Sequence, residues 1–125
     1  GLGPTIAAVR EILPPCPVIP KVHFSCFGSP DFTTALTETG AKSLIVVGIE
    51  THICISQTCL DGLARGYQVH AICDAMSSRT RANWTAGLEK MRQAGVVVSS
   101  TEMTLYEIAE RAGTDEFKQL LKLVK

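Results

Sequence analysis

The chain has no excess of charge of either sign, because twelve acidic residues balance twelve lysines and arginines over 125 residues. Aromatic residues make up only 6% of it, and no basic stripe is interleaved with them. Nucleic-acid binding depends on basic side chains that neutralise phosphates, so we expect no nucleic-acid partner. The apolar runs are also far shorter than the roughly 20 residues of a membrane span, so we expect no membrane partner.

The chain also lacks the cysteine and histidine spacings of disulfide and metal sites. Its five cysteines are odd in number and form no CxxC pair, and its three histidines show neither HxxxH nor HExxH spacing. We therefore predict no disulfide framework and no bound metal. Free thiols favour a reducing compartment, so we expect an intracellular protein, cytoplasmic first, with a mitochondrion or another organelle as alternatives.

Glycine-rich phosphate-binding motifs are missing too. No Gly-x-Gly-x-x-Gly begins a helical stretch, and no P-loop is present. These motifs supply the backbone N–H groups that hold a dinucleotide or a nucleotide phosphate. We therefore predict no nucleotide cofactor, and no other cofactor.

What the sequence does contain is an alternation of short apolar runs with stretches of helical periodicity. The unbroken run Leu44–Val47 predicts a strand buried on both faces. Alternation of this kind predicts an α/β fold with a parallel βαβ sheet and right-handed crossovers. The length suits one domain, residues 1–125. The runs that predict strands are Leu44–Val47, Gln68–Cys73 and Val96–Val98.

Cys54 follows the first of these strands and precedes a helical pattern that begins at Ile55. Ligand crevices of α/β sheets lie at the carboxyl ends of strands. The unpaired N–H groups at a helix start favour a thiolate. Cys54 is therefore a candidate nucleophile, and the alternative is a small buried apolar residue. His52 is a less convincing candidate base, because a histidine in a turn is more often solvated or hydrogen-bonded structurally.

Lys21 is the second candidate for chemistry. Val18 and Ile19, among prolines, predict a short edge strand that ends just before it. On its own Lys21 would be a solvated surface lysine. Phe24 and Phe27 follow it and are candidates for the floor of an apolar pocket.

Five segments carry a resemblance through their order and spacing: Lys21–Phe27, Gly48–Ile55, Asp74–Arg79, Ala94–Val96 and Thr101–Met103. Together they resemble the isochorismatase-like cysteine hydrolases, and the resemblance covers essentially the whole chain. The opening residues 1–5 and the closing residues 117–125 are most similar to the isochorismatase domain-containing branch of that family.

The resemblance implies a three-layer α/β/α fold with a mainly parallel, Rossmann-like sheet. It also implies a site in which Cys54 is the nucleophile and Lys21 lies close to its thiol, where an ammonium would lower the thiol pKa. Backbone N–H groups around Glu50 and Cys54 would form the oxyanion hole, next to a cis peptide bond between Ile49 and Glu50. The predicted substrate pocket comprises Phe24, Phe27, Ile49 and Thr51.

One part of the family pattern has no counterpart in this chain. The family's third catalytic group is an aspartate at the end of its first strand, and neither Asp31 nor Asp61 occupies a matching place. We therefore interpret the chain as a partial, N-terminally truncated domain that lacks the first two strands. Such a truncation would leave the strand at residues 44–48 with an unpaired edge.

The sequence thus predicts a cysteine hydrolase that cleaves the C–N bond of a small amide-type molecule, and a homo-oligomer. The absent aspartate leaves enzymatic activity open. The alternative is an inactive family member or fragment that serves as an oligomerisation or interaction module. A third interpretation, a redox sensor that pairs Cys54 with Cys59, is ranked last because the two residues are poorly spaced for a bridge.

Overall fold

A computed structural model describes residues 3–124 of the chain, and its elements alternate as the sequence predicts. The strands are β1 (Ser43–Ile49), β2 (Gln68–Ser77) and β3 (Val97–Ser99). The helices are α1 (Ala7–Arg10), α2 (Pro30–Thr39), α3 (Ser56–Ala64), α4 (Arg81–Gln93), α5 (Thr101–Ala109) and α6 (Asp115–Val124). A short 3₁₀ turn spans Cys26–Gly28, and a π-helical turn spans Thr51–Ile55.

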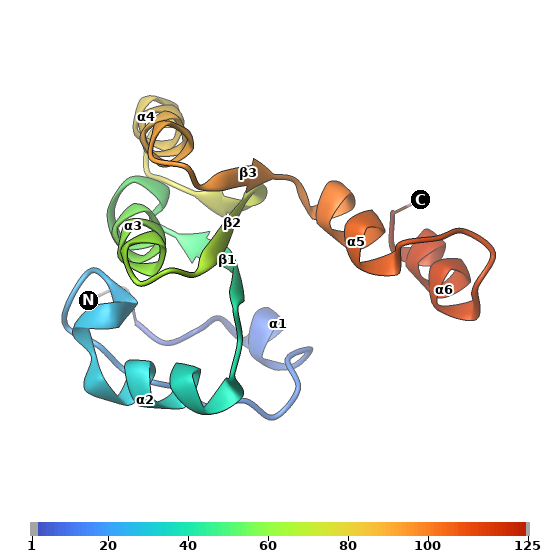
Figure 1. The fold of residues 1–125 in the computed structure, drawn as a ribbon, viewed down its shortest axis with the longest axis horizontal. Coiled ribbons are helices and arrows are strands. Elements are labelled where there is room, and N and C mark those ends of the chain that lie inside the picture. The colour runs from blue at the N-terminus through green and yellow to red at the C-terminus, as the bar shows by residue number, and fades with distance from the viewer. Residues whose placement is uncertain (1–2, 125) are drawn as a thin grey trace.

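The three strands form one parallel sheet in the order β1-β2-β3. Helix α3 connects β1 to β2, and α4 connects β2 to β3 (Figure 1). Leu44 lies opposite Val69 and Val46 opposite Ala71, and the register then shifts before Gly48 pairs with Met76. These observations confirm the predicted α/β class with a parallel sheet.

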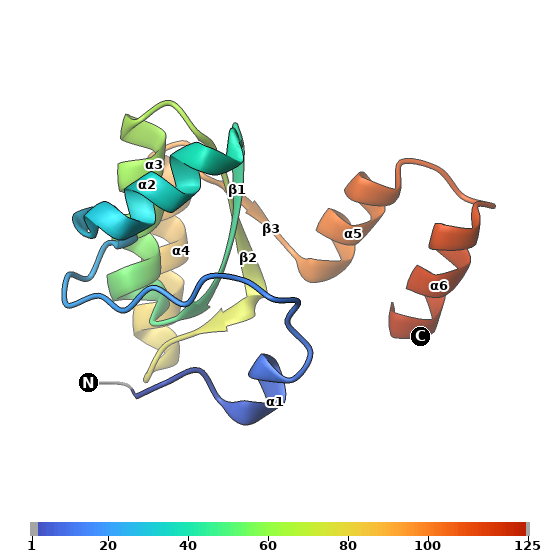
Figure 2. The same ribbon diagram turned by 90° about the horizontal axis from the view of Figure 1, so that it is seen from below.

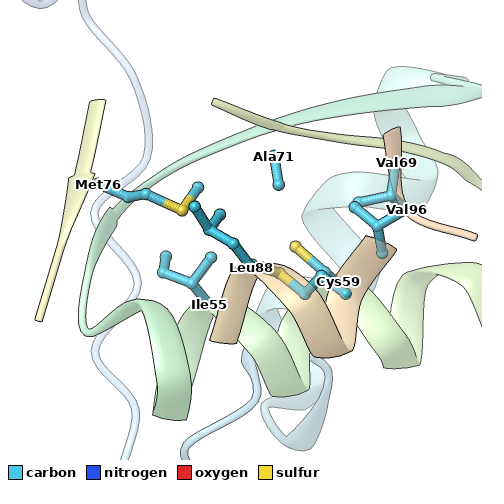
Figure 3. Packing of buried hydrophobic residues seen from close by; sticks show 8 residues of the cluster. Ile55, Cys59, Val69, Ala71, Met76, Leu88 and Val96 are labelled. Carbon is cyan, nitrogen blue, oxygen red and sulfur yellow. The ribbon is translucent and has the colours of Figure 1, made fainter. Parts of the chain in front are cut away.

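The core lies between the sheet and the pair α3 and α4, which cover the same face (Figure 1). Cys59 of α3 and Met91 of α4 are fully buried there, against Val69 and Ala71 of β2. Figure 3 shows the side chains of these elements converging beneath the sheet. The helical periodicity that places Leu88 and Met91 on one side of α4 therefore produces the packing expected of it.

The opposite face of β1 is open, and the prediction that this strand is buried on both faces is wrong for this chain. Ile45, Val47 and Ile49 are each about half exposed, at 53%, 52% and 53%. Within residues 3–124, β1 pairs with a strand on one edge only. An unbroken apolar run marks a strand that suits burial on two faces, but packing partners decide whether both are covered.

The segment before Lys21 also differs from the prediction. Val18 and Ile19 form no strand, and the chain passes through this region without regular structure. Pro17 and Pro20 flank the pair and lack the N–H donors that a sheet ladder requires. The flanking prolines thus leave this pair with fewer donors for a sheet ladder.

Helices α5 and α6 extend away from the sheet on the side opposite α3 (Figures 1 and 2). The Ser100 hydroxyl accepts a hydrogen bond from the Met103 N–H and so caps α5. The two helices meet through Tyr106 and Phe117, whose rings pack edge to face with centroids 5.8 Å apart. No helix among the described residues is both long enough and apolar enough to cross a lipid bilayer.

Candidate active site

Cys54 lies in the π-helical turn Thr51–Ile55, between the end of β1 and the start of α3. We call this segment the Cys54 turn. The chain enters it through Gly48, whose φ of +113° favours glycine, and through a cis peptide bond between Ile49 and Glu50. The Glu50 carbonyl accepts hydrogen bonds from the N–H groups of Ile53 and Ile55, at 3.1 and 3.2 Å. Cys54 is half-buried at this strand-to-helix junction, the place that the sequence predicts.

The Cys54 turn is attached to the end of β2 by two side chains. The Thr51 hydroxyl donates to the Ser77 carbonyl at 3.0 Å, and Thr51 is fully buried. The His52 Nδ1 atom lies 3.0 Å from the Ser78 hydroxyl. His52 therefore has a structural partner, and its geometry gives no reason to assign it as a general base.

An ion pair of Glu50 also links the Cys54 turn to the segment that follows β2. Its carboxylate contacts the Arg79 Nε at 3.0 Å and lies 3.6 Å from the His52 Nδ1. The Glu50 side chain is only 12% exposed, whereas the Arg79 side chain is 72% exposed. Arg79 thus forms a structural ion pair with Glu50. Asp74 differs, because it accepts hydrogen bonds from Thr101.

Helix α4 contacts the backbone of the Cys54 turn through Gly87. A Cβ atom at Gly87 would lie 3.0 Å from the His52 Cα and 3.2 Å from the Thr51 carbonyl carbon. Such distances are shorter than ordinary van der Waals contact, and both atoms belong to backbone. Only a glycine lets α4 approach the turn this closely.

Lys21 directs its ammonium group to its own loop. The Nζ atom donates to the carbonyls of His23 and Phe24, at 2.9 and 2.8 Å. Lys21 also lines a hollow of about 400 Å³ together with Pro20 and Ser29. In the described part of the chain, no hydrogen bond joins Lys21 to Cys54. The proximity of the two groups stays a prediction.

The predicted pocket residues have different environments. Phe24 and Ile49 are exposed, at 59% and 53%. Phe27 is buried, with its ring 5.2 Å from that of Phe32, edge to face. The hydroxyl of the buried Thr51 is engaged as described above. A pocket role stays a prediction for Phe24 and Ile49, whereas the side chains of Phe27 and Thr51 already pack within the fold.

The cysteines are all free among the described residues, and their surroundings differ. Burial raises the pKa of the Cys59 thiol from its ordinary 9.0 to about 12, with a smaller contribution from the nearby Cys26. Cys59 therefore stays protonated and inert at neutral pH. Its burial argues against the redox interpretation. Within residues 3–124, no group of three or more metal-ligating side chains is placed to hold a metal ion.

Reasoning from the sequence missed Ser77, Ser78 and Gly87 as neighbours of the Cys54 turn. The two serines are 26 residues from their partners in the chain, and no local pattern indicates that separation. For Gly87, however, the sequence itself gives an indication of close packing. A glycine inside a helical pattern costs about 1 kcal/mol relative to alanine, and it often has a packing reason.

Comparison with known proteins places this geometry in a family. The isochorismatase domain model matches residues 3–103. The secreted isochorismatase effector Isc1 of Phytophthora sojae is 40% identical over 99% of this chain and 61% of its own length. The structure of the MAR1 ribonuclease of Caenorhabditis elegans superposes with a TM-score of 0.89 and 34% identity, over 99% of this chain and 64% of that one. The chain thus spans about three fifths of the length of these relatives.

Two further solved structures have names that bear on chemistry and assembly. A pyrazinamidase/nicotinamidase of Streptococcus mutans is 26% identical, with a TM-score of 0.59, over 62% of this chain and 44% of that one. The YcaC gene product of Escherichia coli, described as an octameric hydrolase of unknown specificity, is 25% identical. Its TM-score is 0.73, over 78% of this chain and 48% of that one. The match of the domain model over residues 3–103, the identity to Isc1 and the shared fold show together that this chain belongs to the isochorismatase family.

Proposed function

We propose that this chain carries the nucleophile of a cysteine hydrolase that cleaves C–N bonds in small amide-type molecules. The observation that supports this most is the position of Cys54. Its turn lies between the carboxyl end of β1 and the first residues of α3. Parallel α/β sheets bind ligands at this edge, and a helix start stabilises a thiolate.

The reaction has two stages in this proposal. The Cys54 thiolate attacks the carbonyl carbon of the amide, and the electron pair of the C=O bond moves to oxygen. Backbone N–H groups around Glu50 and Cys54 stabilise that oxyanion. The intermediate then expels the amine, which takes up a proton from solvent water, and leaves a thioester on Cys54. Water hydrolyses the thioester, releases a carboxylic acid and regenerates the thiol.

A small molecule suits this chain better than a polymer. The pyrazinamidase/nicotinamidase neighbour has an amide substrate in its name. A ribonuclease name also occurs among the neighbours, but the zero formal charge gives RNA phosphates little attraction.

The second candidate is an interaction module without catalysis. It is favoured by the open apolar face of β1, where Ile45, Val47 and Ile49 are each about half exposed. We also propose that the protein forms a homo-oligomer, since a structural neighbour is octameric. The experiment below separates the enzyme from the module.

The test is the pH dependence of alkylation at each cysteine, followed by peptide mass mapping. For the hydrolase, we expect Cys54 to react with iodoacetamide severalfold faster than the exposed Cys16 at pH 7, because the helix start favours its thiolate. Exposed Cys16 serves as the internal reference.

Turnover is measured in parallel with nicotinamide, pyrazinamide and a single-stranded RNA, and Cys54→Ser is the inactive control. Release of ammonia from an amide by the wild type, but not by Cys54→Ser, would support the hydrolase. RNA cleavage without amide hydrolysis would contradict it. If Cys54 is alkylated no faster than Cys16 and the protein turns over no substrate, the interaction module is favoured.

A further inference from the structure

We propose that Gly87 and the Glu50–Arg79 ion pair are positioning groups that hold the Cys54 turn from two sides. The proposal rests on the proposed function only in treating Cys54 as the nucleophile. Neither group needs to touch the substrate. Each acts through the backbone that places the Cys54 thiol.

The first contact is on the helix side. Helix α4 packs against the Cys54 turn, and Gly87 is the point at which the two backbones meet. A methyl group there would lie 3.0 Å from the His52 Cα and 3.1 Å from the His52 nitrogen. Backbone atoms cannot move aside as a flexible side chain can. An alanine at this position must therefore displace the turn, two residues before Cys54.

The second contact is on the β2 side. Arg79 contacts the Glu50 carboxylate with its Nε atom, at 3.0 Å, and with its backbone N–H, at 3.5 Å. The same carboxylate lies 3.6 Å from the His52 Nδ1. Glu50 is the residue immediately before the turn, and its carbonyl accepts the N–H groups of Ile53 and Ile55. Fixing Glu50 therefore fixes the direction in which the turn begins.

These contacts matter to the thiol because its reactivity depends on where it lies relative to the first N–H groups of α3. A thiolate is stabilised by these groups only within about the first turn of the helix. A displaced Cys54 would lose part of this stabilisation and would react more slowly with an alkylating agent at neutral pH. In this proposal the reactivity of Cys54 depends on Arg79 and Gly87, which lie 25 and 33 positions further along the chain.

Two substitutions test the proposal, and each has a matched control. Gly87→Ala inserts a methyl group against the turn backbone. Gly62→Ala inserts one of the same size at a helical glycine in α3, where a Cβ would meet side chains of Val69 and Leu44 instead. Arg79→Ala removes the Glu50 partner. Arg81→Ala removes an equal charge nearby, from an arginine that lies over the Trp84 ring.

The measurement is the pH profile of Cys54 alkylation in the folded protein, with Cys16 as the reference and circular dichroism to verify folding. We expect Gly87→Ala and Arg79→Ala to slow the alkylation of Cys54 at least threefold at pH 7. Arg79→Lys should recover part of the rate. Gly62→Ala and Arg81→Ala should leave the profile unchanged.

A Cys54 profile that is unchanged in folded Gly87→Ala and Arg79→Ala would overturn the proposal. Equal slowing of Cys54 alkylation in the two test variants and their two controls, Gly62→Ala and Arg81→Ala, would overturn it as well. Such a result would indicate a general loosening of the fold or a general loss of positive charge. If Gly87→Ala does not fold, the exposed Arg79 variants decide the question alone. Failure of the proposed function appears elsewhere, as absent turnover by the wild type, so the two results remain distinguishable.

Discussion

At the scale of single residues, Cys54 and Cys59 show how five positions along a chain separate two kinds of thiol. Cys54 is half-buried in a turn, whereas Cys59, on α3, is fully buried against α4 and β2. A buried thiol resists ionisation because the apolar surroundings do not solvate its charge. Cys59 thus contributes packing, and its chemistry becomes visible only at high pH.

Cys59 predicts how stability changes with pH. Its folded-state pKa of about 12 lies above the ordinary value of 9.0. The folded protein therefore keeps the proton where the unfolded chain has lost it. The contribution of Cys59 to the free energy of unfolding is complete below pH 9 and is lost as the pH rises from 9 towards 12.

Between pH 8 and pH 10 we expect this group alone to lower the free energy of unfolding by about 1 kcal/mol. Urea denaturation at the two pH values measures the loss, and Cys59→Ala is the control. The variant is less stable at both values because it leaves a cavity, but its stability should fall less between them. An equal decrease in wild type and variant would show that Cys59 ionises as readily in the folded protein as in the unfolded chain.

At the scale of elements, helix α5 is attached to the sheet through Asp74 of β2. The Asp74 carboxylate accepts the Thr101 N–H at 2.8 Å and the Thr101 hydroxyl at 3.0 Å, at the first residue of the helix. The Thr101 N–H is the main cause of a lowered pKa for Asp74. A negative charge at a helix N-terminus also interacts favourably with the helix dipole.

Asp74→Ala should loosen the attachment of α5 and α6 to the sheet. We expect proteolysis within residues 100–124 to become severalfold faster, while cleavage elsewhere keeps its rate. Limited trypsin digestion followed by mass spectrometry measures this. Glu89→Ala, an exposed change on α4, is the control.

The same contact predicts acid sensitivity in the wild type. A lowered folded-state pKa means that the stabilisation is present above the unfolded value of 3.8 and is lost as the pH falls through the folded value. Faster cleavage of this region in wild type should therefore appear only under strongly acidic conditions, with an acid-active protease. Unchanged cleavage in Asp74→Ala would mean that the packing of α5 on β2 suffices without the carboxylate.

At the scale of the whole molecule, the covered and open faces of the sheet contrast most strongly. Helices α3 and α4 cover one face of the sheet (Figure 1). On the other face Ile45, Val47 and Ile49 of β1 are about half exposed, and within residues 3–124 this strand pairs along one edge only. Exposed edges with apolar side chains pair readily with other chains. Zero net charge adds no repulsion between copies.

We therefore expect the chain to associate at micromolar concentrations through this face. Val47→Lys should reduce the associated fraction severalfold, because a charge on an edge strand opposes pairing. Light scattering coupled to size-exclusion chromatography measures the mass. Val22→Lys, at a 94% exposed position in the N-terminal loop, is the control. If both variants associate like the wild type, the contact between copies lies on another surface.

The order of strands and helices follows from the sequence alone, because apolar periodicity is a short-range property that each segment carries by itself. The same holds for the place of Cys54, since a strand run, Gly48 and a helical pattern are consecutive in the chain. The edge strand expected at Val18 and Ile19 failed for a local reason as well, namely the prolines around it.

Only the tertiary structure decided which groups meet at the Cys54 turn and which face of β1 is covered. The contacts of Glu50 with Arg79 and of His52 with Gly87 depend on the register between β1 and β2 and on the path of α4. Register and helix placement depend on how segments that are distant in the chain pack against one another. For the same reason an apolar run predicts that β1 suits burial, while the presence of a covering partner is a property of the assembled fold.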